Sequence, residues 1–446
     1  MQGIVSTKFD SFNSHMRTFR KKLIVKICSS FRPGYLVSAF CCAIIAVRAV
    51  TIYLNDLKVF PNNYQWRELM INYEGGFIRR GLLGQILYWF DSFIAMPYLA
   101  GIIYGLCLLV LLICFAVMLE KLRLPAFLKI MILLSPGLLL FEISQEVMLK
   151  KDLITLASLV VISLFASSFV LHRIKNGIFE LCFGLIVVVS LLVNEIVMLF
   201  LPVIFIYLLP AYRSRHLLTR WLFMAAVLAA VGCMLTVPYV GGADEANRIF
   251  ASWQTKYPSL TDYTGSAFDP FSFMAMPHEN YLGWVRFSLS SNPLRISCVV
   301  LFILSVLPSV FIMCMYRTLS ALSGRIYQAL FCLSALSPLA LFAFGMDFGR
   351  WIVMGSIVFT FLVLNLQYVA NERGTERVIC LGRYTAAAAF VAAVFYVVLW
   401  QAAHWSVSGQ SLLSWSGAGN FVWSIFDGEW LQGQLGVVVY KVNKLF

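Results

Sequence analysis

Residues 178–211 read IFELCFGLIVVVSLLVNEIVMLFLPVIFIYLLPA, an apolar run broken by the polar pair Asn194-Glu195. A membrane-spanning helix needs about 20 mostly apolar residues, so the run holds either one long span or two short ones joined at that pair. The arginines of residues 213–220 decide between the two. With two spans, these arginines lie on the same side of the membrane as every other short basic loop. With one span, the arginines and all later loops would lie on the opposite side. We therefore predict a split at Asn194-Glu195.

The composition is that of a membrane protein. Of the 446 residues, 61% are hydrophobic and 12% are charged, whereas a soluble domain has about 25% charged residues. The apolar runs predict an all-α, polytopic helical bundle with about eleven transmembrane helices. The expected spans are 34–54, 93–118, 125–145, 153–172, 178–194, 196–211, 221–240, 294–316, 326–345, 352–371 and 385–403.

The distribution of charge predicts the orientation of the chain. Lysines and arginines are frequent in the N-terminal segment and in each alternate short loop, so we place the N-terminus in the cytoplasm. The formal net charge of +13 then reflects contact with anionic lipid, and no nucleic-acid partner is expected. The expected regions are a basic cytoplasmic amphipathic tail (1–32), one transmembrane domain (33–403) with outer loops 55–92 and 241–292, and an interfacial outer segment (404–446).

The first outer loop contains the stretch NYEGGFIRRGLLG at residues 72–84, with Glu74, Arg79 and Arg80 among four glycines. A charge held close to hydrocarbon is costly and is usually retained for function. Glu74 suits a general base or a ligand for a cation on a phosphate, and the two guanidiniums suit a pyrophosphate. The alternatives are an internal ion pair with Glu74 and arginines that reach for lipid headgroups. If residues 81–88 are helical, a phosphate would also meet the helix N-terminus.

Other charged residues lie at predicted outer ends of spans. The functional candidates are Asp347, Arg350, Glu195, Lys150, Lys151, His278 and Arg286. Asp347 and Arg350 are three residues apart, so an intrahelical pair is the alternative to a base beside a phosphate-binding arginine. A simple turn is the alternative for Glu195, and membrane anchoring is the alternative for the aromatic loop that contains His278 and Arg286. All these helix ends meet one membrane surface, which allows a shared cavity there.

The cysteines predict neither a disulfide nor a metal centre. None lies in a predicted outer loop, and no Cys/His pattern has the spacing of a zinc site. We expect no metal site and no cofactor, although a divalent cation on a phosphate is compatible with Glu74.

This arrangement resembles polyprenyl-linked glycan enzymes, namely the Wzy-type O-antigen and capsule polymerases and the GT-C glycosyltransferases. The resemblance rests on the topology and on two short stretches, residues 74–84 and 347–351. The first outer loop lacks an Asp-Asp or Asp-x-Glu pair and no large C-terminal soluble domain follows, which favours the polymerase. The resemblance implies glycosyl transfer at the outer face of a bacterial inner membrane, with polyprenyl-linked glycans, membrane lipids and other polysaccharide-assembly proteins as partners.

In that reaction the resemblance assigns the pyrophosphate to Arg79, Arg80 or Arg350, and the base to Glu74 or Asp347. Positioning and charge stabilisation would supply most of the acceleration. Two alternatives stay open: a transferase that uses a polyprenyl-monophosphate sugar, and a secondary transporter or flippase. Transporters carry charges near the membrane midplane in matched repeats, whereas the charges here lie at one face.

Overall fold

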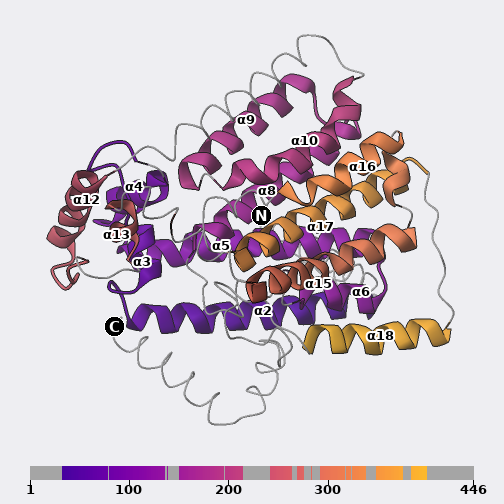
Figure 1. Ribbon diagram of the computed structural model, residues 1–446, viewed down its shortest axis with the longest axis horizontal. Coiled ribbons are helices and arrows are strands. Elements are labelled where there is room, and N and C mark those ends of the chain that lie inside the picture. Colours follow the sequence, from indigo (N-terminus) through magenta and orange to yellow (C-terminus); the bar gives the residue numbers. More distant parts are fainter. Residues whose placement is uncertain are drawn as a thin grey trace, which may run out of the picture.

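Helices are the regular secondary structure of the residues that the computed structural model describes (Figure 1). Those residues are 33–78, 80–135, 138, 150–194, 196–213, 242–263, 269–275, 283, 292–316, 318–322, 324–337, 348–374 and 383–398. The first helices are α2 (Pro33–Lys58), α3 (Tyr64–Leu69), α4 (Gly81–Phe90), α5 (Met96–Lys121), α6 (Ala126–Leu133), α8 (Lys151–Val170), α9 (Asn176–Val193) and α10 (Val197–Arg213). They are followed by α12 (Ala243–Lys256), α13 (Pro270–Ala275), α15 (Asn292–Tyr316), the 3-10 helix η2 (Thr318–Ala321), α16 (Arg325–Ser334), α17 (Phe348–Glu372) and α18 (Arg383–Val398).

Five of these helices are long and apolar enough to cross a membrane: α2, α5, α8, α15 and α17. This confirms the prediction of an all-α, multi-pass membrane protein. Helices lie in ten of the eleven predicted spans, and the other span, 221–240, falls outside the described residues. The total of eleven spans therefore stays a prediction. The tail 1–32 and the segment 404–446 also lie outside the described residues.

The predicted break in the long apolar run is confirmed. Helix α9 ends at Val193, and Asn194 follows it in an extended conformation, with φ −160° and ψ 113°. The Asn194 side-chain oxygen accepts a hydrogen bond from the backbone N–H of Ile196 at 3.3 Å. An asparagine that binds the backbone two residues ahead stabilises a turn, so α10 starts anew at Val197.

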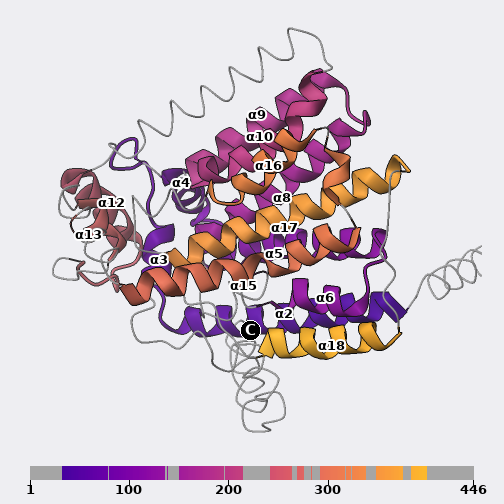
Figure 2. The ribbon, with the colours of Figure 1, turned by 45° about the vertical axis from the view of Figure 1, so that its right-hand side comes forward.

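Helix α17 is the central helix of the bundle, because 94% of its apolar stretch of 18 residues is buried inside the protein. It packs against α15, α8, α5 and α10 (Figure 2). Phe361 of α17 contacts Phe115 of α5 with ring centroids 4.9 Å apart. The hydroxyls of Thr360 and Ser309 form a 2.7 Å hydrogen bond between α17 and α15. Helices α5, α8, α10 and α15 thus surround α17 and separate it from lipid.

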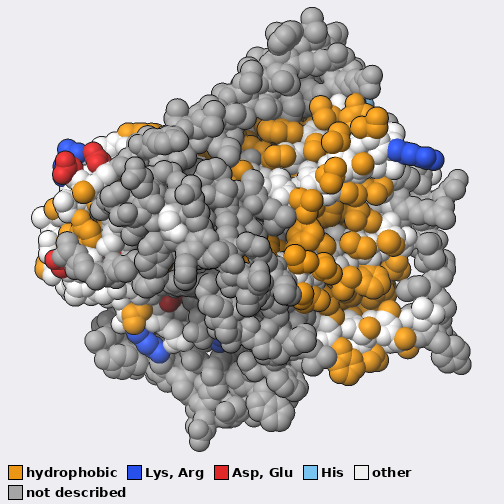
Figure 3. Space-filling view, viewed as in Figure 1, with side chains coloured by type: hydrophobic (Ala, Val, Ile, Leu, Met, Phe, Trp, Pro, Cys, Tyr) orange, Lys and Arg blue, Asp and Glu red, His pale blue; other side chains and the backbone are white. Residues whose placement is uncertain are grey.

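Helix α5 shows the opposite pattern on its outer side. Ile102, Leu106, Leu109 and Ile113 are each more than half exposed, and their spacing of three or four residues places them on one helical face. Exposed apolar side chains in such a stripe are expected where a helix contacts lipid chains. Figure 3 shows hydrophobic side chains across the described surface in the right half of the view, while the visible charged ones lie toward its left end and at its right margin.

Three of the spanning helices end at one side of the bundle. Arg173, just after α8, donates hydrogen bonds to the hydroxyl of Tyr368 and to the carboxylate of Glu372 near the end of α17, each at 2.6 Å. The Lys121 ammonium at the end of α5 lies 5.1 Å from the centre of the Tyr368 ring. These contacts agree with the prediction that the basic loops after α5, α8 and α17 share one membrane face.

The other side of the bundle carries a cap made of α3, α4, α12 and α13 (Figure 1). Helix α12 is amphipathic and buries Trp253, whose indole N–H donates to the backbone carbonyl of Met70 at 2.6 Å. Arg67 of α3 forms a buried ion pair with Asp269 just before α13. Lys256 donates to the backbone carbonyl of Tyr88 in α4 at 2.7 Å. The two predicted outer loops are therefore bound to each other.

Candidate functional site

The structure describes five of the ten predicted site residues. Glu74, Arg80, Lys150, Lys151 and Arg350 lie at the end of the bundle that carries the cap, or in the loop beside it. The other five lie outside the described residues: Arg79, Glu195, His278, Arg286 and Asp347. Their roles stay predictions.

Glu74 is exposed and held by a neighbouring amide. The Gln85 side-chain nitrogen donates to the Glu74 carboxylate at 2.8 Å, and the Gln85 oxygen accepts from the backbone N–H of Tyr73 at 2.7 Å. Burial, and then the negative charges of Glu74 and Asp91, raise the pKa of Tyr88. Among the described residues Glu74 forms no ion pair. Its carboxylate is thus fixed in position and open to solvent, as a base or a ligand for a cation requires.

Most of the glycines in this loop make room for the protein itself. A Cβ on Gly75 would lie 2.6 Å from the backbone oxygen of Glu245, and one on Gly84 would lie 2.0 Å from that of Ile71. At Gly81 it would meet the Tyr73 ring at 2.2 Å. At these three positions, glycine is therefore required by close contacts within the protein.

Arg80 joins this loop to the N-terminus of α8. It precedes α4 in the left-handed conformation, with φ 61°, which is uncommon for a residue other than glycine. Its backbone carbonyl accepts a hydrogen bond from the Lys151 ammonium at 2.7 Å. Its guanidinium lies 3.6 Å from a carboxylate oxygen of Glu68 in α3. Among the described residues, Arg80 therefore pairs with Glu68 and not with Glu74, the partner considered from the sequence.

Two buried lysines begin α8. Lys150 is the N-cap and its ammonium lies 5.9 Å from the centre of the Tyr64 ring of α3, while Lys151 is fully buried. The N-terminus of a helix carries partial positive charge, so it favours anions and disfavours cations. Lysines at this place therefore add positive charge to the N-terminus of α8.

The third component is an ion pair between α8 and α17. The Arg350 guanidinium lies 3.0 Å from the Asp152 carboxylate, and both side chains are more than nine-tenths buried. The Asn194 amide donates to the other oxygen of Asp152 at 3.3 Å, which adds the end of α9 to the site. Arg350 thus pairs across helices with Asp152.

We call Glu68, Arg80, Lys150, Lys151, Asp152 and Arg350 the charged cluster. Its members come from the cap, from α8 and from α17, and four of the six are basic. Sequence reasoning missed Glu68, because α3 has too few residues for a clear periodicity. One signal was present: Tyr64 and Glu68 are four residues apart, and this spacing puts both on one face of a helix.

Comparison with known proteins identifies a family. Residues 35–260 match a family model described as "Uncharacterised membrane protein Rv1490". The matched segment runs from α2 through α12 and includes all the charged cluster except Arg350. No curated protein and no solved structure matches the chain.

Proposed function

This chain belongs to the family of the uncharacterised membrane protein Rv1490, and we propose that it is a glycosyltransferase that acts on polyprenyl-(pyro)phosphate-linked glycans. The proposed location is the outer face of the bacterial inner membrane, and the proposed reaction is the polymerisation of O-antigen or capsule repeat units. The proposal includes about eleven spans in a GT-C-like arrangement, with a cytoplasmic N-terminus.

The observation that carries the proposal is the charged cluster. Four basic side chains and the N-terminus of α8 lie at one end of an apolar bundle. A phosphate is the anion best suited to such a place, because arginines bind two of its oxygens at once and a helix N-terminus offers free N–H groups. Charges near the membrane midplane would favour a transporter, and this cluster lies at a helix end.

In the proposed reaction the cluster binds the leaving group. An acceptor hydroxyl attacks the anomeric carbon of the donor, the bond from that carbon to the phosphate oxygen breaks, and a new glycosidic bond forms. Glu74 takes the proton from the hydroxyl, and Arg80, Lys150, Lys151 and Arg350 stabilise the released pyrophosphate. This mechanism needs only a base and positive charges in fixed positions, and such charges act strongly where water is excluded.

A binding experiment tests the first half of the proposal. The purified protein in lipid nanodiscs is heated with undecaprenyl pyrophosphate or with undecaprenol, and the melting temperature is recorded. We expect the pyrophosphate alone to raise it, because a ligand at about 100 times its Kd stabilises the folded state by about 2.7 kcal/mol. Arg80→Asn should remove the shift, since asparagine tolerates the left-handed backbone of this position. The control is Arg173→Met at the other end of the bundle.

A gene deletion tests the second half. Loss of a polymerase should leave single lipid-linked repeat units at the outer face and remove long glycan chains. Loss of a flippase would instead retain those units at the inner face, and loss of a monophosphate-dependent transferase would remove one sugar from chains of normal length. The proposal would be refuted if undecaprenyl pyrophosphate did not raise the melting temperature of the wild-type protein, or if the glycans of the deletion strain were unchanged.

A further inference from the structure

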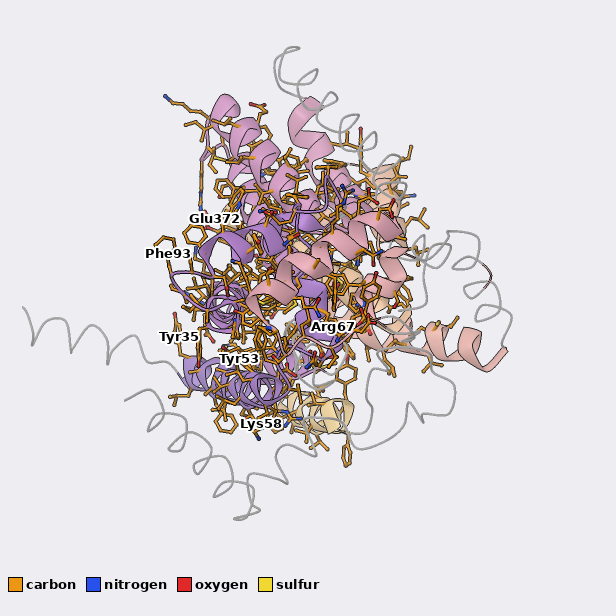
Figure 4. All side chains as sticks on the ribbon, turned by 90° about the vertical axis from the view of Figure 1, so that its left-hand side faces the viewer. Tyr35, Tyr53, Lys58, Arg67, Phe93 and Glu372 are labelled. Carbon is orange, nitrogen blue, oxygen red and sulfur yellow. The ribbon has the colours of Figure 1, made fainter. Side chains whose placement is uncertain are left out.

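The corner between α4 and α5 exposes large apolar side chains at the capped end of the bundle. We call Trp89, Phe90, Phe93, Ile94 and Tyr98 the aromatic corner; all are at least 42% exposed, and Phe93 is 82% exposed. Figure 4 looks onto this end of the bundle and shows Phe93 at its outer edge, with Arg67 nearer the middle. The aromatic corner thus faces the surroundings of the protein and not its core.

The corner is continuous with a surface that contacts lipid. Tyr98 is the first residue of the exposed stripe of α5, and Ile102, Leu106, Leu109 and Ile113 follow it at helical spacing. Because α5 is one of the spans, this stripe lies against acyl chains. An exposed apolar patch that extends such a stripe belongs to the same interface.

The corner is also held in one position by the cap. The Asp91 carboxylate accepts hydrogen bonds from the backbone N–H of Met96 at 2.7 Å and from the Tyr257 hydroxyl. Lys256, at the end of α12, lies 3.7 Å from the same carboxylate. The exposed rings therefore extend from a turn that these hydrogen bonds and the Lys256 contact hold in place.

The lengths of the helices give the depth of the corner. Arg350 and Glu372 lie 22 residues apart in α17, or about 33 Å at about 1.5 Å per residue. That distance is close to the thickness of the hydrocarbon core, about 30 Å. Tyr98 and Lys121 in α5 are 23 residues apart, or about 35 Å, and Lys121 meets α17 at Tyr368. Tyr368 is 18 residues from Arg350, or about 27 Å, so the start of the corner lies at or beyond the level of Arg350, near the boundary of the hydrocarbon.

We propose that the aromatic corner inserts into the membrane leaflet on the capped side, between the headgroups and the upper acyl chains. Tryptophan and tyrosine favour that zone because their rings are apolar and their N–H and O–H groups are polar. Insertion fixes the depth of the cap, and with it holds the charged cluster at the level of lipid phosphates. This inference does not rest on the proposed function.

Photo-crosslinking in nanodiscs tests the occupant of this surface. p-Benzoylphenylalanine is introduced at Phe93, at Leu106 as a lipid-facing control, and at Gln254 as a control on the exposed side of α12. After irradiation, mass spectrometry should find lipid adducts at Phe93 and Leu106, with the Gln254 variant at background. A Phe93 variant that forms no lipid adduct, or that instead joins two copies of the chain, would overturn the proposal.

Fluorescence quenching measures the depth independently. The fluorescence of Trp89 is obtained as the difference between the wild type and Trp89→Phe, in nanodiscs whose lipids carry bromine high on the acyl chain or near its end. We expect bromine high on the chain to quench more strongly. Equal quenching at both depths, or none, would contradict insertion at the boundary. Because neither experiment uses a glycan, both results are independent of the test of catalysis.

Discussion

Replacement of Gly84 by alanine should disrupt the contact between α4 and the segment before the first glycines. The added methyl would lie 2.0 Å from the Ile71 carbonyl oxygen and 2.7 Å from that of Leu69, whereas ordinary contact begins near 3.4 Å. Both obstacles are backbone atoms, and a backbone cannot rotate away as a side chain does. Helix α4 must therefore move outward, and Gln85, which positions Glu74, moves with it.

Two opposing effects set the magnitude. Overpacking of this kind costs about 1–3 kcal/mol, while alanine in a helix interior gains about 0.5–1 kcal/mol over glycine. We expect a net loss of about 1 kcal/mol for Gly84→Ala, because the middle of the first range exceeds the middle of the second by about that amount. The matched control is Gly105→Ala in α5, where nothing lies within 4 Å of the added methyl. The control should gain about 0.5–1 kcal/mol from helix propensity alone.

Chemical unfolding of both variants in the same detergent provides the assay. The midpoint should fall for Gly84→Ala and rise slightly for Gly105→Ala. If Gly84→Ala matches the control, α4 does not approach residues 69–71 as closely as described, and the reasoning about this loop is wrong.

Three further predictions concern single side chains. Arg350→Met should cost about 3–5 kcal/mol, because it breaks a buried ion pair by removing one of its partners, whereas Arg173→Met, at an exposed pair, should leave the unfolding midpoint almost unchanged. Tyr257→Phe should cost about 1.5 kcal/mol at pH 7 through the lost hydrogen bond to Asp91. Burial and that bond raise the pKa of Tyr257, so the stability it contributes is complete below about pH 10 and is lost as the pH rises further; the variant should lose less on alkaline titration. Arg123→Gly should raise the melting temperature, because the left-handed backbone after α5 (φ 51°) costs a residue other than glycine about 1–2 kcal/mol, which exceeds the backbone entropy of about 0.5–1 kcal/mol that glycine loses.

Much of the fold was predictable because lipid imposes strong rules on sequence. Runs of apolar residues and the sides chosen by basic loops located the helices, and Asn194 marked the break between α9 and α10 because its side chain can bind its own backbone. The start of α5 was predicted at residue 93, but the helix begins at Met96. Pro97 in the first turn explains the shift, because proline is favoured at the first positions of a helix and not inside it.

The site was less predictable, because its contacts join residues that are distant in the chain. The sequence placed Arg80, Lys151 and Arg350 at one membrane surface, but not which partner each would have. The ion pair between Arg350 and Asp152 depends on how α17 is rotated against α8, and no local pattern encodes that rotation. The pairing of Glu68 with Arg80 likewise depends on how the cap folds over the bundle, which adds to the short length of α3 as a reason that Glu68 was missed.

The enclosed position of α17 also has a consequence for biogenesis. It is the least apolar of the five spans and carries buried polar side chains such as Arg350, Asn365 and Gln367, so direct release into lipid would be costly for it. The helices that surround it, α5, α8, α10 and α15, are all synthesised earlier. When α17 is synthesised, the helices that enclose it are therefore already present, and its insertion completes the interior of the bundle.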